Sequence, residues 1–337
     1  MSEKMPEKEK IDNSPLGKKR MRKHEKASNM WMAVFVVAAL VIMAFFAGYY
    51  TGFKQNSVPN TGGTEKITVI DDYGRTVNVP KYPQRIISLA ASSTEVIYSI
   101  GLGDRVVGVD DFSDYPEDAK NKTKVGSFDL NYEVIAGLKP DIIVGADIIS
   151  KQTVSTLEKR GYVVIILAPK SLNGILQNIR LMGLVTGKEK EANDLAGWLD
   201  SRISNVTAKT SGANVSRLRT YLEYYPYYTY GQGSIGNDLI LMAGGFNIAS
   251  NTTVQYPQVT KEFVIGSNPG IIIFTQGAFT DTTVEKIKQR PGWSVIDAVK
   301  SDKIYSIDDN SISRPGPRMV NALEDLAKLI HPELFSP

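Results

Sequence analysis

The sequence predicts an α/β protein of two similar lobes that are joined by a helical segment and preceded by one membrane-spanning helix. Three observations predict this: strand-like runs alternate with helical segments on both sides of residues 171–210, one small pattern occurs twice, and residues 30–50 carry no charge. Strands that alternate with helices are typical of parallel sheets covered on both faces. The expected segments are a basic cytoplasmic tail (1–29), a transmembrane anchor (30–50), a flexible linker (51–65), a first lobe (66–170), linker helices (171–210) and a second lobe (211–337).

The anchor is predicted from "MWMAVFVVAALVIMAFFAGYY", residues 30–50. At about 1.5 Å per residue, this uncharged helix spans a hydrocarbon core of roughly 30 Å. A buried core helix and a cleaved signal peptide are the alternatives. The unbroken apolar run argues against the first, and the lack of an A-x-A pattern and of any cysteine argues against the second. The basic stretch "KKRMRKHEK" just upstream places the N-terminus in the cytoplasm and the lobes outside.

Composition excludes several classes of function. Residues 1–29 hold nine Lys/Arg against five Asp/Glu, which accounts for the positive net charge of the chain, so we expect no nucleic-acid surface. There is no Cys, and the two histidines are His24 and His331. A His/Cys metal site and Ser-His-Asp or Cys-His catalysis are therefore excluded, and we expect neither an enzyme nor a resident cofactor.

The first lobe is expected to begin with a hairpin, "KITVIDDYGRTVNVP", that turns at Asp72 to Gly74. Strands follow at "RIISLA", "RVVGV", "DIIVGA" and "VVIIL", separated by helices. Ser92 and Glu95 have the spacing of a capping box, which predicts a helix start there. Gly101 or Gly103 is expected to end this helix.

A long helical region is expected from Leu172 to Lys209, interrupted at "TGKE". Strands and helices then resume in the second lobe with "RLRTYLEYY", "SIGNDLILMAGG", "TKEFVIGS", "GIIIFT", "DTTVEKIKQR" and "KIYSID", and a closing helix is expected near 317–330. The stretch "GQGSIG", residues 231–236, matches a dinucleotide motif literally, but its context favours a glycine-rich turn that faces the cleft between the lobes.

One pattern occurs once in each lobe. In "NYEVIAGLKPDIIVG", Glu133 precedes Pro140 by seven residues, and an apolar run follows the proline. In "KEFVIGSNPGIIIFT", Glu262 precedes Pro269 by the same distance, 129 residues later. We therefore expect the two lobes to be pseudo-equivalent units.

Aromatic residues gather in loops where a cleft is expected. "DDFSDYP" and "GSF" contribute Phe112, Tyr115 and Phe128, and "LEYYPYYTYG" and "QYPQV" contribute six tyrosines. About half of these tyrosines are expected to be ordinary strand residues, and the others suit a large, partly apolar ligand. In "SISRPGPR", Arg314 and Arg318 are candidates either for contact with an anionic group or for a cap or salt bridge.

These segments together resemble the substrate-binding proteins of ABC importers for iron-siderophore complexes and cobalamin. The resemblance covers roughly residues 66–335 and rests on segments that occur in order. They are "DDYGRTVNVPKYPQRIISLAASSTEVIYSIGLGDRVVGV", "SDYP", "KVGSFDLNYEVIAGLKPDIIV", "GGFNIA", "YPQVTKEFVIGSNPGIII", "PGWSVIDAVKSDKIYSID" and "SRPGPRMVNALEDLAKLIHPELF".

The resemblance implies two Rossmann-like lobes joined by a single long helix, with the ligand held between them. It implies that Phe112 and Phe128 line the first-lobe side and that Tyr228 and Tyr256 line the second. The charge of Arg314 would suit an anionic iron chelate. It also implies that Glu133 and Glu262 dock on an ABC permease dimer that works with ATPase subunits.

The function expected from this resemblance is that of a monomeric, membrane-anchored receptor that captures a metal chelate, cobalamin or a ferric siderophore, outside the cell. A surface sensor or adhesion module that reuses the fold is the alternative. The paired acids Glu133 and Glu262 favour the receptor.

Overall fold

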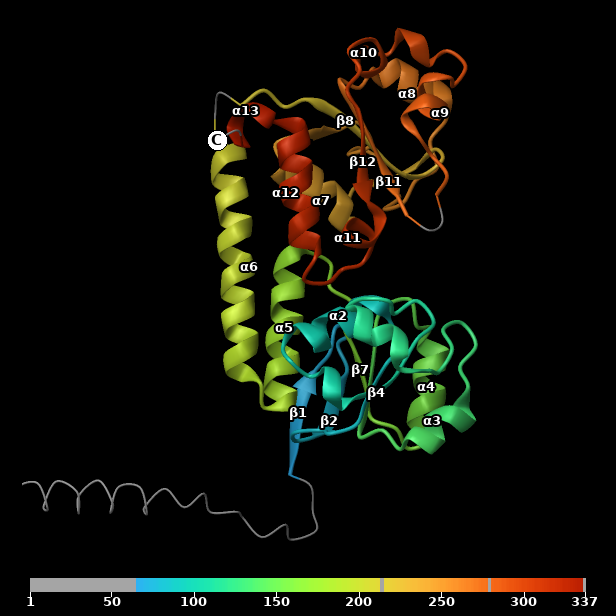
Figure 1. Ribbon diagram of the computed structural model, residues 1–337, viewed down its shortest axis with the longest axis vertical. Coiled ribbons are helices and arrows are strands. Elements are labelled where there is room, and N and C mark those ends of the chain that lie inside the picture. Colours follow the sequence, from blue (N-terminus) through green and yellow to red (C-terminus); the bar gives the residue numbers. More distant parts are fainter. Residues whose placement is uncertain (1–64, 213–214, 278–279, 336–337) are drawn as a thin grey trace, which may run out of the picture. The chain divides into compact units, whose positions relative to one another are not determined.

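The computed structural model describes residues 65–212, 215–277 and 280–335 (Figure 1). The predicted anchor, residues 30–50, and the tail before it lie outside these ranges. Within them, no helix is both long and apolar enough to cross a lipid bilayer. The predicted α/β organisation in two lobes is confirmed, since each lobe is built around a parallel sheet of its own.

The first lobe starts with the expected hairpin and continues as a five-stranded parallel sheet in the order β5-β4-β3-β6-β7. β3 and β6 are buried along their whole length, because they are central strands whose two faces are both covered. The hairpin strands are β1 (Lys66–Ile70) and β2 (Thr76–Pro80). The sheet strands are β3 (Ile86–Ser88), β4 (Val106–Val109), β5 (Thr123–Lys124), β6 (Ile142–Gly145) and β7 (Val164–Ile166). The helices are α2 (Ala91–Ser99), α3 (Tyr132–Leu138) and α4 (Lys151–Lys159), with short 3-10 helices at Gly103–Arg105 and Glu117–Asn121.

The second lobe repeats this plan. Its parallel strands have the order β10-β8-β11-β12, and β9 pairs with the end of β8 in the antiparallel sense. The strands are β8 (Arg219–Tyr225), β9 (Tyr228–Thr229), β10 (Phe246–Asn247), β11 (Ile271–Gln276) and β12 (Ile304–Asp308). The helices are α7 (Ile235–Met242), α8 (Lys261–Ser267), α9 (Val284–Lys288), α10 (Asp297–Lys300), α11 (Asp309–Ser313), α12 (Met319–Ile330) and α13 (Pro332–Phe335), with a 3-10 helix at Trp293–Val295.

The linker is a helical hairpin, which corrects the expectation of a single long helix. α5 (Leu172–Thr186) ends at Gly187, whose φ of 74° is left-handed and therefore favours glycine. The chain then reverses into α6 (Glu189–Thr210), which lies beside α5 and reaches α12 of the second lobe (Figure 1). The interruption predicted at "TGKE" is thus a complete turn between two helices.

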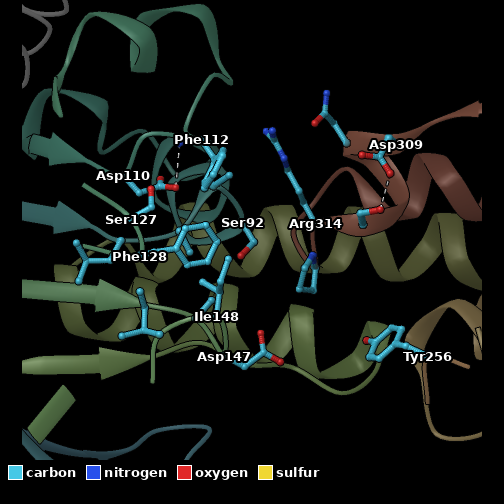
Figure 2. A pocket seen from close by; sticks show the side chains of 18 residues that line it. Ser92, Asp110, Phe112, Ser127, Phe128, Asp147, Ile148, Tyr256, Asp309 and Arg314 are labelled. Carbon is cyan, nitrogen blue, oxygen red and sulfur yellow. Dashed lines mark hydrogen bonds between the residues drawn. The ribbon is translucent and has the colours of Figure 1, made fainter. Parts of the chain in front are cut away.

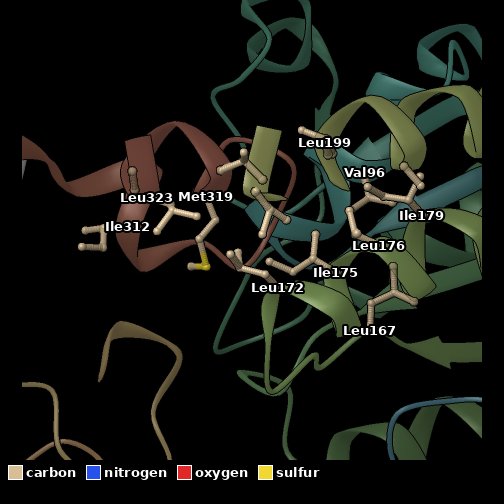
Figure 3. Close-up of a cluster of buried hydrophobic side chains, with 14 of the residues drawn as sticks. Val96, Leu167, Leu172, Ile175, Leu176, Ile179, Leu199, Ile312, Met319 and Leu323 are labelled. Atoms are coloured by element: carbon tan, nitrogen blue, oxygen red, sulfur yellow. The ribbon is translucent and has the colours of Figure 1, made fainter. Parts of the chain in front are cut away.

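One continuous apolar core extends from the first lobe through the linker into the second (Figure 3). Leu172 and Ile175 of α5 belong to it together with Met319 and Leu323 of α12, and all four are buried. Burial of one side chain of this size stabilises a fold by about 1.5–3 kcal/mol. A change in the relative position of the lobes would expose several of these side chains, so the shared core opposes it.

The duplicated pattern folds into the same unit twice. α3 is capped by the Asn131 side chain and α8 by the Thr260 side chain, and each helix has seven residues. Both end on a residue in the left-handed region, Lys139 (φ 45°) and Asn268 (φ 42°), followed by the proline and the buried strand. The two lobes therefore share this helix-turn-strand unit and the order of four parallel strands, β4-β3-β6-β7 in the first and β10-β8-β11-β12 in the second.

Candidate functional site

A cavity of about 560 Å³ lies between the two lobes, a size typical of small-molecule sites (Figure 2). Its first-lobe wall is formed by the loops that follow β3, β4, β5 and β6, at the carboxyl ends of the strands. β3 has β4 on one side and β6 on the other, so the direction of the chain order reverses there. Ligands of open parallel sheets bind at such a reversal. The second lobe closes the cavity with Tyr256 and with residues 309–315.

Aromatic side chains face this cavity from both lobes. Phe112 and Phe128 meet edge to face with ring centroids 5.9 Å apart. Phe128 is 80% exposed, and Tyr256, which lies across the cavity, is 53% exposed (Figure 2). Large apolar surfaces left open to water inside a cavity are suited to bind a flat or partly apolar ligand. Three of the four aromatic positions predicted from the sequence therefore line one cavity.

A second cavity of about 260 Å³ adjoins the first and shares Asp147, Tyr256, Ser313 and Pro315 with it. Tyr224 and Tyr230 line it, with ring centroids 5.1 Å apart. Burial raises the pKa of Tyr230, and partial burial raises that of Tyr256, so both are neutral phenols. The joint space is thus larger than either cavity and has tyrosine rings along its second-lobe side.

Tyr228 is not among the side chains that line these two cavities. It lies on β9 and contacts Tyr224 and Tyr225, with ring centroids 6.0 and 5.9 Å away. Contact between Tyr228 and the ligand stays a prediction, because this side chain lines neither of the two cavities. Tyr228 supports Tyr224, which does line the second cavity.

The glycine-rich stretch is a turn, as its context predicted. Gly233 has a φ of 80°, and α7 begins after the Ser234 cap. Gly233 and Gly236 line the second cavity. A Cβ at Gly236 would lie 2.2 Å from the Tyr230 ring, so the absence of a side chain lets that ring reach its place.

Arg314 lines the first cavity but is already paired. Its guanidinium forms an ion pair with Asp114 of the first lobe and lies 3.7 Å from a Glu95 oxygen. Partial burial acts to raise the pKa of Asp114, but Arg314 holds it below its usual value. Of the two roles foreseen for this arginine, the structure shows the salt bridge.

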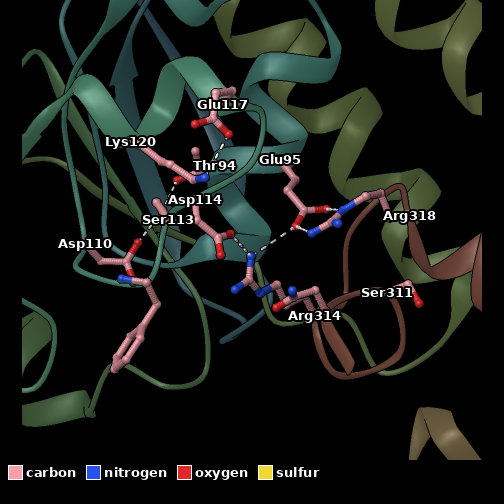
Figure 4. A network of polar contacts seen from close by, with 12 residues as sticks. Thr94, Glu95, Asp110, Ser113, Asp114, Glu117, Lys120, Ser311, Arg314 and Arg318 are labelled. Atoms are coloured by element: carbon pink, nitrogen blue, oxygen red, sulfur yellow. Dashed lines mark hydrogen bonds and ion pairs between the residues drawn. The ribbon is translucent and has the colours of Figure 1, made fainter. Parts of the chain in front are cut away.

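The predicted capping box at Ser92 and Glu95 is wrong. The cap position of α2 is Ala90, two residues before Ser92, and no side chain caps the helix. The Glu95 carboxylate instead accepts two hydrogen bonds from Arg318, at 2.9 and 2.5 Å, and so joins the lobes (Figure 4). Glu95 is 3% exposed, and this burial raises its pKa although both arginines lower it.

The cross-lobe ion-pair network, which we define as Glu95, Asp114, Arg314 and Arg318, balances two acids against two bases. The Tyr115 ring lies 4.1 Å from the Arg318 guanidinium and covers it. Tyr115, expected near the ligand, therefore supports the network instead.

Glu133 and Glu262 are the second residues of α3 and α8. Both are exposed, and Glu262 has a loose ion pair with Lys261 at 3.6 Å. Neither lines the two cavities. They occupy equivalent places on equivalent helices, as the duplication predicted.

The acidic residues of the cavity wall were not among the site residues predicted from the sequence. Asp147 follows β6 and Asp309 follows β12, so both stand at carboxyl ends of strands. That position was a usable signal, because polar residues there face the site in a parallel sheet. Glu95 and Asp114 carried no such signal, since their partners lie about 200 residues away.

The described residues hold no group of three or more His, Cys, Asp or Glu side chains that could bind a metal ion.

Comparison with known proteins agrees with this geometry. The chain is 28% identical over 319 residues to an uncharacterised ABC transporter substrate-binding lipoprotein, YvrC, of Bacillus subtilis, covering 92% of this chain and 99% of the relative. The periplasmic vitamin B12-binding protein BtuF of Vibrio cholerae has a similar structure, with 26% identity, a TM-score of 0.66, and coverage of 76% of this chain and 100% of that one. The periplasmic haem-binding protein RhuT of Roseiflexus is also similar, with 25% identity, a TM-score of 0.67, and coverage of 74% and 99%.

These relatives are binding proteins and not enzymes, in agreement with the prediction from composition. The family model for periplasmic binding proteins matches residues 86–311, which include both sheets and the linker. The chain belongs to the periplasmic binding protein family.

Proposed function

We propose that this chain is the membrane-anchored, extracytoplasmic receptor of an ABC importer, and that it holds a metal chelate between its lobes. The observation that carries this proposal is the aromatic cavity at the carboxyl ends of two equivalent parallel sheets. Binding of this kind needs shape, apolar area and a few polar contacts, all of which the cavity supplies. The named ligands of two similar structures, vitamin B12 and haem, are both large metal chelates.

Cobalamin and ferric siderophores are the proposed ligand classes. Both have extended apolar surfaces and carry their metal with its own donor atoms. Phe112 and Phe128 offer an apolar platform on one side, and Tyr256 offers a ring with a hydroxyl on the other. This division suits a ligand whose body is apolar and whose edge is rich in amide or carbonyl groups.

Glu133 and Glu262 are the proposed contacts to the permease. A permease of two similar halves presents the same surface twice, once on each half. A receptor with two equivalent acids can contact both of these surfaces at once. The exposure of the two carboxylates and their absence from the lining of both cavities support this separation of roles. The two carboxylates would contribute to docking on the permease and would not contribute to the affinity for the ligand.

Residues 30–50 are the proposed anchor. The Bacillus relative is named a lipoprotein, but this chain has no cysteine to which a lipid could be attached. An uncleaved apolar helix would hold the binding domain at the same membrane by a different means. Alkaline carbonate extraction of cell membranes tests this: an anchored chain stays with the lipid, and release into the supernatant would contradict it.

The test of the ligand uses the full-length chain in detergent micelles. Cyanocobalamin and neutral ferric hydroxamates are titrated and followed by their visible absorbance after gel filtration. We expect saturable retention of one class at one ligand per chain. Phe128→Ala should weaken it, whereas Phe246→Ala, at an exposed aromatic residue of β10 that lines neither cavity, should not. Retention of neither class would overturn the proposal.

A further inference from the structure

The cations on the walls of the two adjoining cavities are all bound to carboxylates. Among the described residues, Arg314 and Lys170 are the Lys and Arg side chains that line these cavities. Arg314 belongs to the cross-lobe network, and Lys170 forms an ion pair of 2.8 Å with Asp147. This carboxylate raises the pKa of Lys170, and the two opposite charges of the pair offset each other.

Asp309 is the carboxylate that no cation balances. It lies in the first turn of α11, lines the first cavity and accepts a hydrogen bond of 2.7 Å from the Ser313 hydroxyl (Figure 2). No ion pair joins it to a Lys or Arg among the described residues. Its negative charge therefore acts on whatever enters the cavity.

A second acid stands behind the aromatic platform. Asp110 lines the first cavity, is 3% exposed, and accepts hydrogen bonds from the Ser113 hydroxyl and the Phe112 amide. The Lys124 ammonium binds the backbone carbonyls of Asp110 and Ser113, so it offsets part of this charge. Burial also raises the pKa of Asp110, so the unbalanced negative charge of the cavity is assigned to Asp309.

Arg314 and Lys170 each already have a carboxylate partner, so an anionic ligand would have to compete with that partner for either cation. Displacing Arg314 would separate it from Asp114 and draw it away from Glu95, which is buried. A buried carboxylate that loses a cationic neighbour is strongly destabilised. The network therefore holds Arg314 in its present role, and an anionic ligand meets Asp309 without compensation.

We propose that this site takes neutral or cationic metal chelates and discriminates against anionic ones, and that Asp309 is the main determinant of this choice. The inference rests on the proposed function and narrows its ligand class. It places cobalamin and uncharged or cationic ferric hydroxamates inside the class, and ferric catecholates and haem, with their negative charges, outside it.

The test uses ligands that share one body and differ in charge. Ferrioxamine B carries a free ammonium group, its N-acetyl derivative is uncharged, and its N-succinyl derivative carries a carboxylate. Cyanocobalamin and a cobalamin monocarboxylate form a second matched pair. The dissociation constants of all five are measured with the full-length chain in micelles at low and high salt.

Within the ligand series that binds, we expect the dissociation constant of the anionic member to be roughly ten times that of the neutral member at low salt. The ratio of the two constants should be smaller at high salt. Asp309→Asn should bring the two constants together, because the amide keeps the size of the side chain and removes its charge. Asp200→Asn, at an exposed residue of α6 that lines neither cavity, is the control and should leave the ratio unchanged.

The outcomes separate this inference from the proposed function. Equal affinity for the neutral and anionic members of a series that binds would overturn the inference and leave the proposed function standing. An unchanged ratio in Asp309→Asn would overturn the role of Asp309. Binding of no member of either series would overturn the proposed function and, with it, this inference.

Discussion

Replacing Arg318 with Met removes the guanidinium that pairs with the buried Glu95 carboxylate and keeps an apolar stem of similar length. In the structure, Arg318 makes both of its ion-paired hydrogen bonds to Glu95, across the boundary between the lobes. The arginine side chain is 19% exposed and the glutamate side chain 2%, so solvent screens this pair little. The substitution leaves a carboxylate in the interior with Arg314, 3.7 Å away, as its nearest cation.

The size of the effect follows from this burial. Removing one partner of a buried ion pair costs about 3–5 kcal/mol. Because Arg314 remains near, we expect the lower end, a loss of about 3 kcal/mol in the free energy of unfolding at about pH 8. An exposed pair such as Lys190 and Asp194 should contribute less than about 1 kcal/mol by comparison.

The loss should depend on pH in a defined direction. Burial already raises the pKa of Glu95, and removal of Arg318 raises it further. A carboxyl group whose pKa is higher in the folded state stabilises the fold below its unfolded pKa, near about 4.3, and this stabilisation disappears as the pH rises through the folded pKa. The deficit of Arg318→Met relative to the parent should therefore be small at about pH 4.5 and largest at about pH 8.

Urea unfolding of the full-length chain in micelles, followed by tryptophan fluorescence at several pH values, measures this difference. The double variant Glu95→Gln/Arg318→Met lacks the Glu95 carboxyl group, so its difference from the parent should vary less with pH than that of Arg318→Met. A deficit of Arg318→Met that is the same at both ends of the range would refute the assignment of a buried, ionised Glu95.

Three further predictions concern docking, binding and the linker. Glu133→Arg and Glu262→Arg should each abolish chelate uptake by cells and leave the dissociation constant unchanged, whereas Glu285→Arg, at the same place in α9, should permit uptake; a loss of affinity would disprove docking. Phe128→Ala should weaken chelate binding roughly tenfold in a titration with little change in Tm, because the ring is 80% exposed; a large fall in Tm would show a structural role. Gly187→Ala should lower Tm by several degrees, since the residue is left-handed and a Cβ would lie 2.5 Å from the Tyr82 ring; an unchanged Tm would contradict this.

Local patterns predicted the fold well because each lobe is built from short, strongly apolar strands. "DIIVGA" and "GIIIFT" became β6 and β11, both central in their sheets. The duplication around Glu133 and Glu262 also appeared in the structure as predicted, since cap, turn and strand lie within a few residues of one another. Properties set by neighbouring residues are accessible from a single sequence.

Properties set by distant residues were missed or misassigned. Ser92 and Glu95 have the spacing of a capping box, but a bidentate ion pair to Arg318, 223 residues away, decides where the Glu95 carboxylate points. The single linker helix became a hairpin because the packing of α5 against α6 buries apolar faces of both. Arg314 was a candidate to contact an anionic ligand, but in the structure it forms an ion pair with Asp114 of the other lobe. Charge balance in a cavity depends on such long-range pairs, so local sequence patterns do not reveal it.

Hydrogen–deuterium exchange of the full-length chain, with and without a saturating chelate that it binds, tests most directly whether the ligand lies between the lobes. We expect slower exchange at 110–113, 127–128 and 147–149 of the first lobe and at 309–315 of the second, all in one titration, because these segments form opposite walls of one cavity. Slower exchange in one lobe alone, or an unchanged exchange rate in all of these segments, would contradict binding between the lobes.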